Sequence, residues 1–62
     1  MNEDIKIYIE NNLKYFELEG VEITNEDIEL VKQKINQGKN LEEACDSVLI
    51  GIRECLDEGL IN

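Results

Sequence analysis

Carboxylates are the most numerous side chains in this sequence that could take part in acid–base chemistry. Fifteen Asp and Glu residues stand against six Lys and Arg, which gives a formal net charge of −9. Paired carboxylates can act as general acid and base where a cleft shifts their pKa values. Short helices in a chain of 62 residues cannot build such a cleft. We therefore interpret the acidic pairs as solvated surface.

Nucleophiles and metal ligands are too few for an enzyme. The sequence has no His, a single Ser at position 47 and a single Thr at position 24, which is expected to cap a helix. Cys45 and Cys55 fall ten residues apart in one expected helix. A rise of about 1.5 Å per residue then keeps their Cα atoms too far apart for a disulfide. We predict two buried free thiols, no catalytic residues, no metal site and no cofactor.

The excess of negative charge restricts the partners. A net charge of −9 opposes binding to nucleic acid or to an anionic membrane, and it favours a basic partner. The first ten residues, MNEDIKIYIE, are too interrupted by charge for a signal peptide or a membrane span. We expect a cytoplasmic protein that binds another protein, with neither nucleic acid nor membrane as its partner.

The spacing of apolar residues predicts an all-α fold, a small single domain with helices over about residues 3–18, 25–37 and 41–57. Gly20 is expected to end the first helix in a left-handed conformation, as in a Schellman motif. Thr24 and Asp27 resemble a capping box at the start of the second helix. Gly38 is expected to end that helix, and Asn40 to begin the third.

The first and third helices each have an apolar stripe. In the first, the stripe comprises Ile5, Tyr8, Ile9, Leu13 and Phe16. In the third, Gly51 either permits the close approach of another backbone or lies at an exposed site. The buried face of the third helix is expected to contain Leu41, Ala44, Cys45, Val48, Leu49, Ile52, Cys55 and Leu56.

Two apolar residues of the first helix lie off its stripe. At about 100° per residue, Ile7 and Leu18 point away from the face that contains Ile5 and Phe16. Either they form a docking face for a partner, or the helix is enclosed within its own fold. A homodimer through this face is a further structural possibility.

Glu19 is acidic at a position where a helix C-terminus is expected. A negative charge there opposes the helix macrodipole by roughly 0.3–1 kcal/mol. Its presence reflects either the acidic composition of the whole chain or a role in meeting a cation on another protein.

The stretch YFELEG, residues 15–20, resembles the inhibitory motif Ser/Thr-x-x-x-Glu-Gly/Asn of the VbhA-like small antitoxins, which inhibit Fic-domain adenylyltransferase toxins. The resemblance also includes VEIT at 21–24, the second helix and GKNLEEA at 38–44. It implies a three-helix inhibitor whose Glu19 pairs with the toxin arginine that would hold the γ-phosphate of ATP. Gly20 matches the residue after the motif glutamate.

Tyr15 departs from this motif, because the family has Ser or Thr at the corresponding position. Either the toxin groove is wider, or Tyr15 acts as a hydrophobic anchor. The alternative function is an acidic adaptor or nucleic-acid mimic that covers a basic partner surface through the C-terminal third, where Arg53 is the only basic residue.

Overall fold

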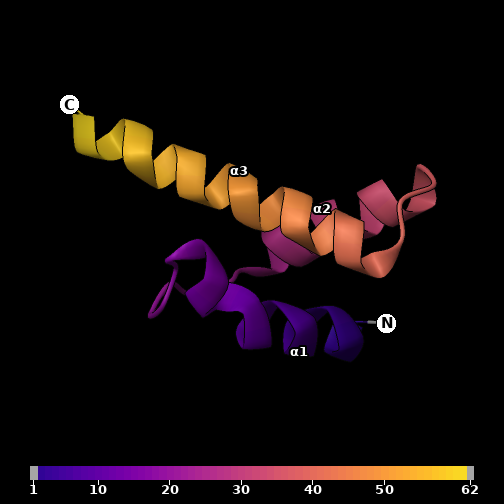
Figure 1. Ribbon diagram of the computed structural model, residues 1–62. Helices are drawn as coiled ribbons and strands as arrows, with labels where there is room; N and C mark the ends of the chain where they lie inside the picture. The colour runs from indigo at the N-terminus through magenta and orange to yellow at the C-terminus, as the bar shows by residue number, and fades with distance from the viewer. Residues whose placement is uncertain (1, 62) are drawn as a thin grey trace.

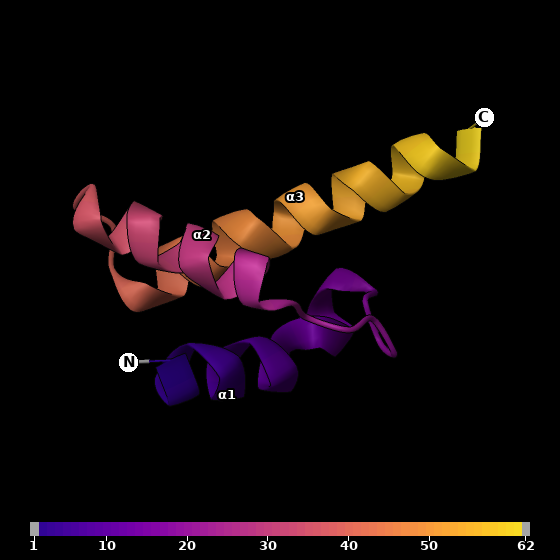
Figure 2. The ribbon, with the colours of Figure 1, turned by 180° about the vertical axis from the view of Figure 1, so that it is seen from behind.

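Three α-helices and one short 3-10 helix make up the chain in a computed structural model that describes residues 2–61, with side chains described for residues 2–58 (Figure 1). They are α1 (Asn2–Asn12), η1 (Leu13–Phe16), α2 (Asn25–Asn36) and α3 (Leu41–Ile61). No strand occurs in residues 2–61, and the predicted all-α fold is confirmed. Both α1 and α2 pack against the first half of α3, whose second half extends beyond them (Figures 1 and 2).

The core is small and entirely apolar over the residues whose side chains are described. Each α-helix contributes to it, and Leu18 contributes from the segment between η1 and α2. A fully buried Ile or Leu stabilises the fold by roughly 1.5–3 kcal/mol, so each of these side chains matters in a domain of this size. The buried residues are Ile5, Ile9, Leu18, Ile28, Val31, Ala44, Cys45, Val48 and Leu49.

The first helix ends earlier than the sequence predicted. The α-helix stops at Asn12, tightens into η1, and reverses at Glu17, whose φ of 58° is left-handed. The Glu17 N–H donates to the Lys14 carbonyl at 3.3 Å and the Leu18 N–H to the Leu13 carbonyl at 2.9 Å, which is the Schellman pattern. The helix therefore ends in a Schellman motif, but Glu17 takes the left-handed position in place of the predicted Gly20, three residues earlier. The reversal directs Leu18 into the core.

Arg53 ties this reversal to α3. Its guanidinium donates to the Glu17 carbonyl at 3.3 Å and pairs with the Glu17 carboxylate at 3.2 Å. It also pairs with Asp57 one turn further along α3 at 3.2 Å. Because these groups are partly exposed, each pair contributes at most about 1 kcal/mol. Together they fix where the turn lies on α3.

The starts of α2 and α3 agree with the predicted caps. The Asp27 N–H donates to Thr24 Oγ1 at 3.4 Å and the Thr24 N–H donates to the Asp27 carboxylate at 3.1 Å, which completes the capping box. Asn40 Oδ1 accepts from the Glu43 N–H at 2.8 Å. Gly38, with φ of 109°, ends the turn after α2 as expected.

The buried face of α3 is shorter than predicted. Cys45 is buried as expected, but Ile52 is only half-buried and both Cys55 and Leu56 are exposed. The reason is that α3 extends past the helices that cover its first half (Figure 2). The expectation of two buried thiols is therefore wrong for Cys55, and both thiols are free. Apart from the adjacent residues and the α3 backbone, nothing lies within 4 Å of the position a Gly51 Cβ would take, so no other described segment approaches closely there.

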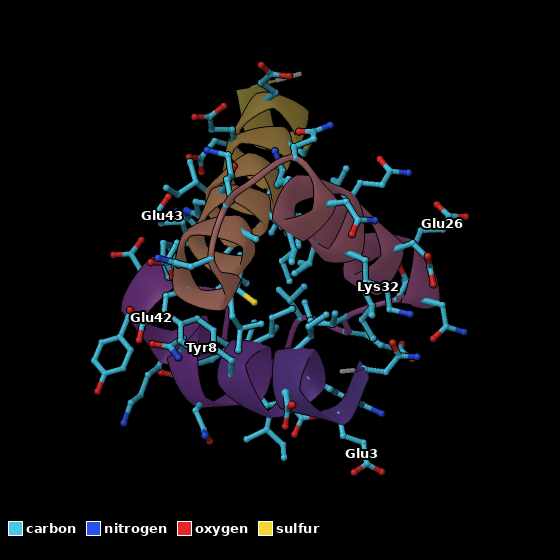
Figure 3. All side chains as sticks on the ribbon, turned by 90° about the vertical axis from the view of Figure 1, so that its right-hand side faces the viewer. Glu3, Tyr8, Glu26, Lys32, Glu42 and Glu43 are labelled. Atoms are coloured by element: carbon cyan, nitrogen blue, oxygen red, sulfur yellow. The ribbon has the colours of Figure 1, made fainter. Side chains whose placement is uncertain are left out.

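Tyr8 links α1 to α3 through a hydrogen bond from its hydroxyl to Asp46 Oδ1 at 3.1 Å. Figure 3 shows Tyr8 between the two helices, on the side of Glu42. Burial, the bond to Asp46 and nearby negative charge raise the pKa of Tyr8 to about 12. Burial, followed by the charge of Asp46, raises the pKa of the Cys45 thiol to about 11.

These two groups predict a loss of stability in alkali. The folded chain holds both protons more tightly than the unfolded chain, whose reference pKa values are 9.0 for Cys and 10.0 for Tyr. The stabilisation is complete below pH 9 and falls as the pH rises from 9 to 12, because the unfolded chain loses its protons first. Thermal melts followed by circular dichroism should show this decline. In Tyr8→Phe the decline between pH 10 and 12 should be smaller, and an identical decline would contradict the role given to Tyr8.

The left-handed conformation of Glu17 predicts an inverted order of glycine and alanine variants. Inside a helix, Gly is less stable than Ala by about 1 kcal/mol. At a left-handed position a residue with a Cβ costs roughly 1–2 kcal/mol, which Gly avoids. Both variants lose the pair with Arg53, so their difference isolates the backbone. Urea unfolding should show Glu17→Gly to be the more stable of the two by about 1 kcal/mol; the opposite order would mean that the helix continues through Glu17.

Candidate functional site

The motif residues Tyr15, Glu19 and Gly20 are all exposed, but they do not lie on one helix. Tyr15 belongs to η1 and is 71% exposed, whereas Glu19 and Gly20 follow in the turn before α2. Gly20 has a φ of 84°, so this turn uses two left-handed residues within four. The expectation that Glu19 lies at a helix C-terminus is wrong, because the helical path has already ended at Phe16. We call residues 17–20 the Glu17–Gly20 turn.

Glu19 is the carboxylate of this turn that has no partner among residues 2–58. It is exposed, and it takes part in none of the ion pairs or hydrogen bonds found among residues 2–58. Its neighbour Glu17 is instead engaged by Arg53. Because Glu19 no longer ends a helix, its conflict with a macrodipole disappears, and its carboxylate is available to a cation from outside the chain.

The two apolar residues predicted to bind a partner have opposite environments. Ile7 is 57% exposed on α1, as expected. Leu18 is 0% exposed, so its predicted outward direction is wrong. The prediction assumed 100° per residue through position 18, but the left-handed Glu17 redirects the chain and buries Leu18. A docking face shared by Ile7 and Leu18 therefore does not exist.

Tyr15 presents most of its ring to solvent. The Lys14 ammonium lies 5.2 Å from the centre of that ring, within the range of a cation–π contact. An exposed phenol four residues before Glu19 offers apolar area with a polar end. This placement fits the anchor interpretation of Tyr15 better than that of a small hydroxyl in a tight contact.

A second surface was missed by the sequence reasoning. A groove of about 620 Å³ lies between α2 and α3, lined in part by Leu30, Val48, Gly51, Ile52, Cys55 and Leu56. The feature of the sequence that could have indicated this groove was Gly51, because it has no side chain and lies in the middle of α3. The size of the groove also depends on how far α3 outruns α2, which the apolar spacing does not specify.

Residues 2–58 contain no group of three or more His, Cys, Asp or Glu side chains that could hold a metal ion. In the same part of the chain, none of the helices is both long and apolar enough to cross a membrane. No protein-family model, curated protein or solved structure gives a significant match to the chain. The inference of function therefore depends on the residues of the site.

The burial of Leu18 predicts that it stabilises the fold and that Ile7 does not. Leu18→Ala should lower the free energy of unfolding by about 2–5 kcal/mol, because it leaves a cavity in the core. Ile7→Ala removes an exposed side chain and should change that free energy by no more than about 0.5 kcal/mol. Urea titrations followed by circular dichroism compare the two. Equal losses would place Ile7 in the core as well.

Proposed function

We propose that this protein is a cytoplasmic antitoxin-like inhibitor that binds a Fic-domain adenylyltransferase toxin and blocks its ATP site with Glu19, which suppresses protein adenylylation. The observation that carries the proposal is the exposed Glu19 carboxylate, which has no partner among the described residues. The resemblance of residues 15–20 to the inhibitory motif of the VbhA-like antitoxins supplies the target.

The chemistry of the block is competition for one guanidinium. A carboxylate and a phosphate both accept two parallel hydrogen bonds from the planar fork of an arginine. If Glu19 occupies the toxin arginine that would hold the γ-phosphate, ATP loses that contact and cannot be held for AMP transfer. The desolvation of both charges offsets much of the attraction in such a pair, so its effect on ATP binding exceeds its contribution to the affinity of the complex.

The Glu17–Gly20 turn gives Glu19 a defined position. On one side Leu18 is anchored in the core, and Glu17 is held by Arg53 through its carbonyl and its carboxylate. A carboxylate on a preorganised turn loses less conformational entropy on binding than one on a mobile loop. The proposal requires Glu19 to act from a turn, because a helix continued through Glu19 would withdraw Leu18 from the core.

Glu19→Gln tests the proposal directly. The substitution keeps the shape of an exposed side chain, so the melting temperature should stay unchanged. Binding to the Fic-domain toxin should weaken by less than about tenfold, since one contact contributes a small part of an interface. Inhibition should nevertheless be lost, and transfer of labelled AMP should return to the rate of the toxin alone.

The matched control is Glu22→Gln, an exposed carboxylate three residues further along the same segment. This variant should inhibit as the natural sequence does. If Glu19→Gln still suppresses adenylylation fully, or if Glu22→Gln releases it equally, Glu19 is not the inhibitory group.

The acidic adaptor or nucleic-acid mimic remains the second candidate, and one observation favours it. Arg53 is the only basic residue after position 40, and both of its ion pairs are to Glu17 and Asp57 of this chain. The C-terminal half of α3 therefore offers acidic groups to a basic surface. Affinity for such a partner should fall steeply as salt is raised, whereas docking on a toxin with apolar burial should resist moderate salt.

A further inference from the structure

The groove between α2 and α3 lies on a different face of α3 from the Glu17–Gly20 turn. Gly51 lines the groove, and Arg53, which holds the turn, follows two residues later. Two residues correspond to about 200° around a helix, so Gly51 and Arg53 point to almost opposite sides of α3. The groove is therefore not explained by the proposed role of Glu19.

Apolar side chains and a missing side chain shape this groove. Leu30 is 43% exposed on the α2 wall, and Leu56 is 42% exposed on the α3 wall. At Gly51, which also lines the groove, an added Cβ would meet nothing within 4 Å apart from the adjacent residues and the α3 backbone. The volume of about 620 Å³ lies within the roughly 300–1,000 Å³ that binding clefts enclose. A backbone could approach α3 closely at Gly51.

The charges around the groove restrict what can occupy it. Glu54 and Glu58 lie one turn after Gly51 and Cys55, on the same side of α3. Asp27 lines the α2 wall, where Lys34 is the one basic lining residue. A second copy of this chain would bring a further charge of −9 to an acidic rim. Like charges that face one another oppose association, so an occupant with basic flanks is favoured.

We propose that the α2/α3 groove binds an amphipathic helix of a partner protein, with apolar side chains between the helix walls and Lys or Arg against the acidic rim. Helices dock in this way when apolar side chains at positions i, i+3, i+4 and i+7 enter a hydrophobic groove. The groove has the complementary spacing, because Val48, Ile52 and Cys55 recur at steps of four and three along α3. This binding site is independent of Glu19.

Cys55 provides a reporter inside the groove. Its thiol is free, exposed and part of the lining, whereas the Cys45 thiol is buried with its pKa raised to about 11. A disulfide reagent such as dithionitrobenzoate should therefore modify Cys55 alone in the folded chain near neutral pH. The probe is a synthetic helical peptide with Leu at positions i, i+3, i+4 and i+7 and Lys elsewhere. A twin peptide has Glu at every Lys position.

The Lys peptide should slow modification of Cys55 by about tenfold or more at saturation, and the Glu twin should not. Absence of protection by the Lys peptide, or equal protection by both peptides, would overturn the proposal. Sedimentation equilibrium of the full chain should show a monomer; a dimer whose formation protects Cys55 would show that the occupant is a second copy and would also overturn it.

Gly51→Leu separates docking from general attraction between opposite charges. The added Cβ has open space, the rest of the side chain enters the groove, and Leu replaces a poor helix former, so the melting temperature should rise. Affinity for the Lys peptide should nevertheless fall by about tenfold or more. The control is Ile50→Ala, an exposed neighbour that does not line the groove, which should leave affinity unchanged.

The acidic rim is tested by the double variant Glu54→Gln and Glu58→Gln. It should weaken the Lys peptide several-fold, while Glu3→Gln with Glu10→Gln on α1 removes the same charge and should have a smaller effect. Unchanged affinity in Gly51→Leu, or equal losses in the two double variants, would mean that the peptide is attracted by net charge alone. Glu19→Gln should bind the peptide normally, so this proposal and the proposed inhibition fail separately.

Discussion

The burial of Leu18 is the constraint on which the first third of the structure depends. Leu18 reaches the core only because the chain reverses at Glu17, a residue with a Cβ in a left-handed conformation. That conformation destabilises the fold by roughly 1–2 kcal/mol, while burial of the leucine side chain stabilises it by roughly 1.5–3 kcal/mol. The partly exposed contacts of Arg53 add at most about 1 kcal/mol each. Burial is therefore the effect that holds the turn, and the ion pairs set its position.

This arrangement also decides which acidic groups stay available to a partner. Arg53 neutralises part of the charge of Glu17 and Asp57, and it is the only base in the C-terminal third. Glu19, two residues from Glu17, receives no such contact among the described residues. Arg53 therefore gives Glu17 a structural role and leaves Glu19 exposed without an ion pair among the described residues. A binding role for Glu19 costs the fold little, whereas one for Glu17 would weaken the turn.

The parts of the fold that could be predicted from sequence are those set by local chemistry. Thr24 with Asp27, and Asn40 with Glu43, satisfy backbone N–H groups within three residues, so the starts of α2 and α3 were found correctly. The end of the first helix was not, because a glutamate rather than a glycine takes the left-handed position, and no local signal marks it. Leu18, which follows Glu17, was therefore placed on the wrong side of the chain. The exposure of Cys55 and the α2/α3 groove follow from the unequal lengths of α2 and α3, which have 12 and 21 residues. The apolar periodicity of each helix does not show how far one helix extends past the other.

Partner binding and folding are linked in a domain of this size. A single core below about 70–80 residues rarely supplies more than about 3–5 kcal/mol. A partner at one hundred times its Kd adds about 2.7 kcal/mol, which is comparable with the whole stability of the free chain. The two proposed binding surfaces, the Glu17–Gly20 turn and the α2/α3 groove, lie against different parts of the core. Contact at the Glu17–Gly20 turn would hold Leu18 in place, whereas contact in the groove would cover the α2–α3 pair and the end of α3 that nothing else in the described chain covers. A partner that contacted both the Glu17–Gly20 turn and the α2/α3 groove would therefore hold α3 in place against the elements packed on it. Each contact would make the other easier to form, because the elements that the second contact needs would already be ordered.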